Sequence, residues 1–171
     1  HTDVAEFDFV SLYPNIMNKH NLSPETLYCK CCRQNKVPGL KYNYCRKERG
    51  IVSEVAGNLI ERRIELKKQK TSAAKEKVDY LKWLLVTMFG YQAFKNRKIG
   101  TIENHESIQA YARETIINSV RAAELQDWEV LHGIIDSIYV KKKNFTDIDV
   151  QRSGKDIYHT TGLEVSHEGK Y

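Results

Sequence analysis

Hydrophobic and polar residues alternate along short stretches of this chain, and this alternation is typical of half-buried β-strands. Strands are expected at residues 4–10, 129–134, 137–142 and 163–166. Elsewhere apolar residues recur every three or four positions, which predicts helices. We expect helices at residues 14–20, 51–70, 73–95, 104–125 and 147–159, with a loop over 21–50 and a break at 96–100.

The two central helices carry apolar stripes on helical spacing. In the first, the stripe is Val52, Val55, Leu59 and Leu66, and in the second it is Val78, Leu81, Leu85 and Met88. Trp83 and Trp128 accompany apolar runs, so we expect both in the core. Hairpin-connected strands mixed with helices indicate an α+β fold, with an antiparallel sheet and helices on one face.

Composition and charge narrow the class of protein. The chain has 171 residues, 41% of them hydrophobic, which suits one globular domain or one domain with a small appendage. No apolar run approaches the roughly 20 residues that span a membrane, so no membrane partner is expected. The chain begins inside a strand pattern, without Met or a signal peptide. We therefore expect a piece of a longer protein.

The net charge of +5 is unevenly distributed. Basic residues gather in the two central helices, and this pattern has two interpretations: an ordinary solvated face, or a cationic surface for phosphates. The residues concerned are Arg62, Arg63, Lys67, Lys68, Lys70, Lys75, Lys77 and Lys82.

All four cysteines lie within residues 29–45, in the pattern C-x-C-C-x₁₂-C. Cys29 and Cys32 have the spacing of a zinc knuckle, and Cys45 is a candidate third ligand for a structural Zn²⁺. The fourth ligand stays open between Cys31 and His20. Free thiols or a disulfide are the alternatives, and clustering of this kind favours a reducing compartment.

Two isolated acids stand at strand ends. Asp8 ends the first strand pattern, just before Tyr13-Pro14, and Asp136 lies at the apex of the predicted hairpin. Carboxylates on neighbouring strand ends can hold a pair of divalent cations against a triphosphate.

Three segments together resemble the motifs of family B DNA polymerases. Residues 8–16, DFVSLYPNI, are similar to the first palm motif D-x-x-S-L-Y-P-x-I, and residues 82–91, KWLLVTMFGY, to the fingers motif K-x-x-x-N-S-x-Y-G. Residues 132–140, HGIIDSIYV, resemble the third motif Y-G-D-T-D-S. The three occur in the family's order and span most of the chain, and their divergence suggests an archaeal-type branch.

The resemblance implies a role for each matching residue. Asp8 and Asp136 would hold two catalytic Mg²⁺ ions, and Tyr13 would exclude a 2′-hydroxyl from the incoming sugar. The incoming triphosphate would contact Ser11, the backbone of Leu12 and Tyr13, Arg63, Lys67 and Lys82, and Phe89 would stack over the nascent base pair. Arg63 and Lys67 are four residues apart and share a helix face, whereas Arg62 points about 100° away.

The chain departs from the family pattern at several positions. Phe89 replaces the usual Tyr of the fingers motif and keeps a ring without the hydroxyl. Val86 replaces the usual Asn of the fingers motif and cannot form hydrogen bonds through its side chain. Ile134 replaces the first acid of the third motif, and Ile135 replaces its Thr. Two of three usual carboxylates remain, which predicts reduced or specialised activity.

The resemblance also implies an organisation. Residues 1–20 would be palm, 21–50 a Cys-rich loop, 51–98 the helical fingers, and 99–171 palm again, truncated before the thumb.

The expected function is template-dependent addition of dNTPs to a primer 3′-end, weak or absent in the isolated piece. Partners would be primer–template DNA, dNTP and the missing exonuclease and thumb domains, in a nucleoid-associated cytoplasmic setting. The alternatives are a catalytically impaired module with a DNA-binding or scaffold role, and a zinc-dependent nucleic-acid-binding domain.

Overall fold

The computed structural model describes residues 2–94 and 99–171. The chain divides into two compact units, residues 1–12 with 112–171, and residues 13–111. We call them the sheet unit and the helical unit and describe each by itself. Within the described residues, no helix is both long and apolar enough to cross a membrane.

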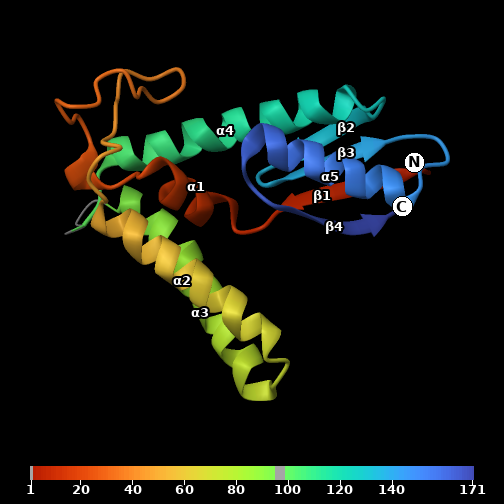
Figure 1. Ribbon diagram of the computed structural model, residues 1–171, viewed down its shortest axis with the longest axis horizontal. Helices are drawn as coiled ribbons and strands as arrows, with labels where there is room; N and C mark the ends of the chain where they lie inside the picture. The colour runs from red at the N-terminus through yellow and green to blue at the C-terminus, as the bar shows by residue number, and fades with distance from the viewer. Residues whose placement is uncertain (1, 95–98) are drawn as a thin grey trace. The chain divides into compact units, whose positions relative to one another are not determined.

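The sheet unit is built on four antiparallel strands (Figure 1). These are β1 (Val4–Phe9), β2 (Glu129–Ile134), β3 (Ser137–Lys141) and β4 (Val165–Lys170), in the order β2-β3-β1-β4. The predicted α+β class with an antiparallel sheet is therefore confirmed. β4 begins two residues later and ends four later than expected, because its pairing with β1 continues to Lys170.

The core of the sheet unit follows from strand alternation. Phe7 and Phe9 of β1, and Ile138 and Val140 of β3, are almost completely buried. Trp128 is buried as expected and packs edge-on against Phe7, with ring centroids 6.1 Å apart. Alternating residues of a strand point to opposite faces, so the intervening residues of β1 form a second, polar face.

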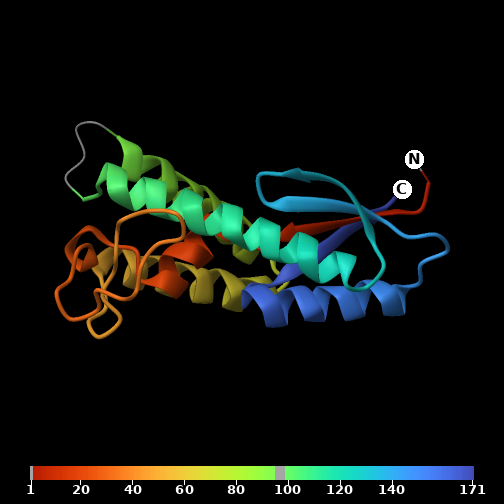
Figure 2. The same cartoon turned by 90° about the horizontal axis from the view of Figure 1, so that it is seen from above.

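The helix α5 (Asp147–Thr161) lies along the sheet (Figure 2). Thr146 caps its first turn by accepting from the backbone N–H of Asp149, and Gly162 ends it in the left-handed conformation at φ 64°. The indole Nε1 of buried Trp128 donates to Ser153 Oγ at 2.7 Å. This bond fixes α5 against the strand hairpin.

The helical unit holds most of the helices. They are α1 (Leu12–His20), the short 3₁₀ helix η1 (Pro24–Thr26), α2 (Ile51–Lys68), α3 (Ser72–Ala93) and α4 (Ile102–Glu124); Leu12 of α1 and residues 112–124 of α4 belong to the sheet unit. α2 and α3 form a hairpin (Figure 1), whose buried cluster is Leu66, Ala74, Val78 and Leu81. Observed helix bounds lie within two residues of the expected ones where the structure describes both. The expected end of α3 at Lys95 and most of the break at 96–100 lie outside the described residues.

One core prediction is wrong: Trp83 is 70% exposed. The buried stripe of α3 runs through Val78, Leu81 and Leu85. Trp83 lies two residues after Leu81, about 200° around the helix, and therefore on the opposite side.

The loop over residues 21–50 is tied to the helices around it. Tyr44 is fully buried, and its hydroxyl donates to Ser107 Oγ of α4 at 3.0 Å. Asn21 Nδ2 donates to the carbonyls of Cys45 and Glu48 at 2.8 and 2.7 Å. These polar bonds take the place of regular secondary structure, which in this loop is limited to η1 and isolated bridges.

Candidate functional site

The register of β1 and β3 brings Asp8 and Asp136 to neighbouring strand ends. Asp8 is the partner of Ser137, the residue after Asp136, and the Ser137 hydroxyl donates to Asp8 Oδ1 at 2.7 Å. The backbone N–H of Phe9 donates to the carbonyl of Asp136 at 2.8 Å. Both carboxylates are half-buried. Two acids that are 128 residues apart in the chain thus lie side by side.

A third acid, Glu6, shares the polar face of β1 with Asp8. It accepts hydrogen bonds from the hydroxyls of Tyr139 at 2.7 Å and Tyr171 at 3.1 Å. The bond to Glu6 raises the pKa of Tyr139 to about 12. Sequence reasoning missed Glu6, although its spacing of two residues from Asp8 places both on one strand face.

Both strand ends at this site pass through the left-handed backbone region. Ser11, after β1, has φ 51°, and Ile135, between β2 and β3, also has φ 51°. A β-branched residue rarely adopts this conformation. Ile134 and Ile135 are 47% and 68% exposed, so the turn presents apolar groups where the family motif has an acid and a Thr.

Within the helical unit, Tyr13 and Phe89 form a parallel ring stack. Their centroids are 4.1 Å apart with an interplanar angle of 4°. Phe89 also stacks with His105, at 4.5 Å and 20°. The sequence gives no local signal for His105, which lies on α4, far from the motifs. In this arrangement the Phe89 ring is engaged by protein rings, so stacking on a base requires it to move.

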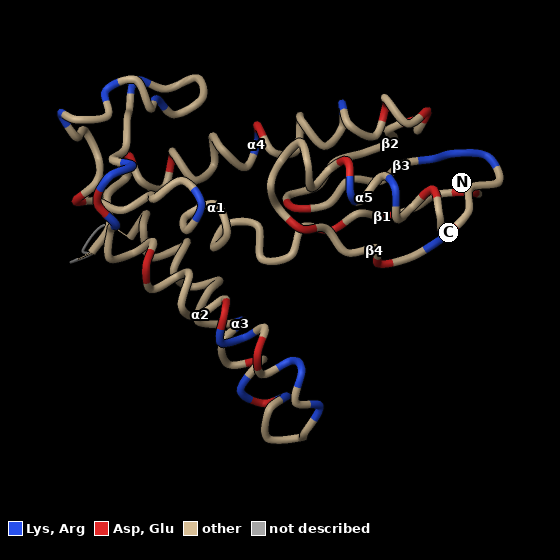
Figure 3. The backbone as a smooth tube through the Cα atoms, viewed as in Figure 1, with Lys and Arg blue, Asp and Glu red and all other residues tan. Residues whose placement is uncertain are grey.

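The predicted cationic residues lie on the α2–α3 hairpin. Lys67 and Lys82 are exposed, whereas Arg63 is half-buried, and this burial lowers the pKa of Arg63, opposed by the charge of Asp79. Arg62 forms an exposed ion pair with Glu65 at 3.0 Å. Figure 3 shows Lys and Arg gathered toward the end of the hairpin. Val86 is 54% exposed and offers no polar group.

The remaining motif residues are placed at the start of α1. Ser11 precedes the helix. Leu12 is the first residue of the helix, and its side chain is buried. The first backbone N–H groups of a helix have no partner within it and suit an anion.

The four cysteines of the loop converge. Their Sγ atoms all lie within 4.8 Å of one another. Cys31 Sγ lies 3.8 Å from that of Cys29, 3.7 Å from that of Cys32 and 3.6 Å from that of Cys45. The structure thus groups Cys31, and not His20, with the candidate ligands Cys29, Cys32 and Cys45. The pKa of Cys45 is lowered to about 7, mainly by the hydrogen bond that its sulfur accepts from the backbone N–H of Glu48.

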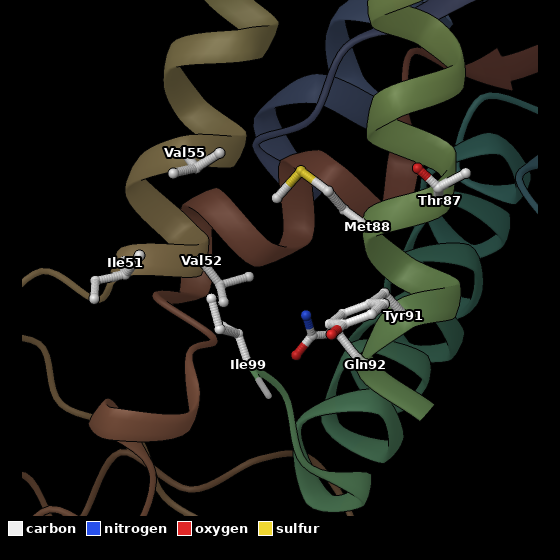
Figure 4. A pocket seen from close by; sticks show the side chains of 8 residues that line it. All are labelled: Ile51, Val52, Val55, Thr87, Met88, Tyr91, Gln92 and Ile99. Atoms are coloured by element: carbon white, nitrogen blue, oxygen red, sulfur yellow. The ribbon is translucent and has the colours of Figure 1, made fainter. Parts of the chain in front are cut away.

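Besides a cavity of about 390 Å³ at the α2–α3 turn, which Lys67 helps to line, the described part of the helical unit contains the following two. One, of about 300 Å³, is apolar and opens between α2 and α3, where the side chains of Val52, Met88 and Gln92 line it (Figure 4). It contains none of the predicted site residues. The other, of about 400 Å³, is basic and is lined by Lys19, His20, Asn21, Arg46, Lys47, Glu48 and Arg49. Burial, with the charges of Lys19 and Arg46, lowers the pKa of His20 to about 4.

Comparison with known proteins places these features in a family. The model of DNA polymerase family B matches residues 1–162. DNA polymerase 2 of Saccharolobus solfataricus is 37% identical over 166 residues, covering 97% of this chain and 24% of the relative. A DNA polymerase of Archaeoglobus fulgidus is 29% identical and covers the whole chain and 23% of that protein.

A solved structure agrees with these relatives. The family B DNA polymerase of Pyrobaculum calidifontis matches all of this chain with a TM-score of 0.79 and 27% identity, over 24% of its own length. The chain therefore spans about a quarter of the length of these relatives. The similarity to archaeal polymerases agrees with the divergent motifs. The match over residues 1–162 shows that this chain belongs to DNA polymerase family B.

Proposed function

We propose that this chain is the palm and fingers part of a DNA-directed DNA polymerase that adds dNTPs to a primer 3′-end by two-metal nucleotidyl transfer. The sheet unit would supply most of the palm, and the α2–α3 hairpin the fingers. The observation that carries the proposal is the pairing of β1 with β3, which sets Asp8 beside Asp136.

The donor set at these strand ends fits Mg²⁺. Oxygen ligands suit this ion, which keeps several waters and takes one or two carboxylates. Asp8 and Asp136 would hold the ions, and Ser137 orients one carboxylate through its bond to Asp8 Oδ1. Bound divalent cations neutralise charge that develops on the transferred phosphate and favour deprotonation of the attacking hydroxyl.

The nucleotide roles rest on the family motifs. Arg63 offers a planar fork for phosphate oxygens, and Lys67 and Lys82 act as point charges. Ser11 and the N–H groups of Leu12 and Tyr13 would complete the triphosphate contacts. The Tyr13 ring would leave no room for a 2′-hydroxyl, and Phe89 would leave its stack to cover the nascent base pair.

Primer–template DNA and the polymerase segments outside this chain are the expected partners. Because the chain spans about a quarter of its relatives, we expect the 171-residue piece to extend primers poorly or not at all. Primer extension by the piece and by the longer polymerase that carries it tests this. Robust synthesis by the piece alone would overturn the expectation.

The role of the acids is tested in the longer polymerase. Asp136→Asn removes a charge with little change of shape and should reduce extension by about 100-fold, equivalent to about 3 kcal/mol. Asp147→Asn is the matched control, because Asp147 is an exposed acid at the start of α5. Equal losses in both variants would contradict the proposed site.

A second function is favoured by one observation: the exposed Ile134 stands where the motif has a catalytic acid. In this alternative the chain is a polymerase-derived module that binds DNA or a replication partner without catalysis. Titrating Mg²⁺ or Mn²⁺ into the longer protein, with and without Asp136→Ala, separates the two. Equal activity, or no activity in both, supports the inert module.

A further inference from the structure

The cysteine quartet has the dimensions of a mononuclear tetrahedral metal site. A Zn–S bond of about 2.3 Å places two sulfurs of a regular tetrahedron about 3.8 Å apart. The three Sγ separations from Cys31 are 3.6, 3.7 and 3.8 Å. An iron–sulfur cluster binds its cysteines through different iron atoms and therefore needs them further apart than the 4.8 Å that contains this set.

Hydrogen-bond donors surround the sulfurs as they do in metal–thiolate sites. The backbone N–H of Arg46 donates to Cys32 Sγ at 3.3 Å, and that of Glu48 to Cys45 Sγ at 3.5 Å. Asn43 Nδ2 lies 3.7 Å from Cys29 Sγ and also donates to the Cys29 carbonyl at 2.9 Å. A thiol sulfur is a weak acceptor, whereas a thiolate gains from such donors, which also orient it toward a metal.

Charge around the quartet complements a metal-bound form. Four thiolates with one Zn²⁺ carry a net charge of −2, and nearby cations stabilise such a charge. Four basic residues lie within two positions of a cysteine in the chain: Lys30, Arg33, Arg46 and Lys47. All four of these side chains are exposed, so they keep their hydration while offsetting the charge.

We propose that Cys29, Cys31, Cys32 and Cys45 bind one Zn²⁺ as a closed tetrathiolate site. Because the protein fills all four positions, the ion is structural, and no position stays open for substrate. The site ties the two ends of the 29–45 segment together. It thereby fixes Arg46 and Lys47, which line the basic cavity beside α1. This inference goes beyond the polymerase function and does not depend on it.

The test begins with the metal content of the 171-residue chain, purified under reducing conditions without a chelating tag. We expect about one zinc per chain and, by X-ray absorption, four sulfur ligands at about 2.3 Å. Less than about 0.1 zinc per chain after reconstitution with Zn²⁺, or stoichiometric iron in its place, would overturn the proposal.

The inclusion of Cys31 is tested separately. Cys31→Ser should weaken zinc binding at least about tenfold in competition with a chromophoric chelator, since even the loss of an outer partner costs that much. Gln34→Ser, an exposed change in the same loop, is the matched control and should leave affinity unchanged. If Cys31→Ser does not fold, the ligand count of the unmodified chain decides. Three sulfurs with one nitrogen or oxygen would show that Cys31 is not a ligand.

Discussion

Restoring the missing acid at position 134 should strengthen divalent metal binding. Ile134 is the last residue of β2 and pairs with Ser137, which in turn pairs with Asp8. Directly opposed residues of antiparallel strands project from the same face. Ile134 therefore stands in one row with Ser137 and Asp8, and Ile134→Asp would add a carboxylate to that row.

The expected gain in divalent-cation affinity depends on how exposed position 134 is to water. Ile134 is 47% exposed, so the interaction of a new carboxylate with a cation is closer to the value in water than to that of a buried pair. Two unit charges about 4 Å apart in water attract by about 1 kcal/mol, which gives about 2 kcal/mol for a divalent ion. This corresponds to about 30-fold tighter binding.

The assay is calorimetric titration of Mn²⁺ into the unmodified chain, Ile134→Asp and Ile134→Asn. The Asn variant has nearly the same shape as Asp but no charge, so it separates charge from polarity. We expect the increase only for Asp. Equal affinities of the Asp and Asn variants would refute the reasoning that position 134 faces the metal site.

Further predictions concern stability and are measured by urea unfolding. Phe89→Ala removes the ring stacked on Tyr13 and His105 and should lower the free energy of unfolding by about 2 kcal/mol; a loss below about 0.5 kcal/mol would contradict a formed stack. At position 135 the backbone φ is 51°, so the free energy of unfolding of Ile135→Gly should exceed that of Ile135→Ala by about 1 kcal/mol. Equal stability of the two variants would show that the turn is unstrained. The lowered pKa of His20, about 4 against an ordinary 6.5, means that the unfolded chain binds the extra proton. The contribution of neutral His20 to the free energy of unfolding is therefore complete above pH 6.5. It is lost as the pH falls toward 4, by at most about 1.4 kcal/mol per pH unit. His20→Asn should remove this slope, and an unchanged slope would assign it to other groups.

Local patterns in the sequence predicted the elements well, for physical reasons visible in the structure. Alternation in β1 works because Phe7 and Phe9 face the core while Glu6 and Asp8 do not. Helix ends follow caps such as Thr71, whose hydroxyl accepts from the backbone N–H of Ala74. The pairing of β4 up to Lys170 depends on a partner strand and has no such local signal.

The same contrast applies to the candidate site. The motifs located Asp8 and Asp136, and only the register of β1 against β3 shows them as neighbours. Contacts between distant segments could not be predicted from the sequence. Examples are the hydrogen bond from Tyr171 to Glu6 and the stack of His105 on Phe89. Adjacent cysteines usually diverge along a chain, so the turn that gathers Cys31 with the other three could not be read from spacing.

Shared cation binding by the two acids is tested most directly by anomalous diffraction from crystals of the chain soaked in Mn²⁺. We expect a peak within about 2.5 Å of a carboxylate oxygen from both Asp8 and Asp136. A bound ion that touches only one of these carboxylates, or none at this edge of the sheet, would contradict this expectation.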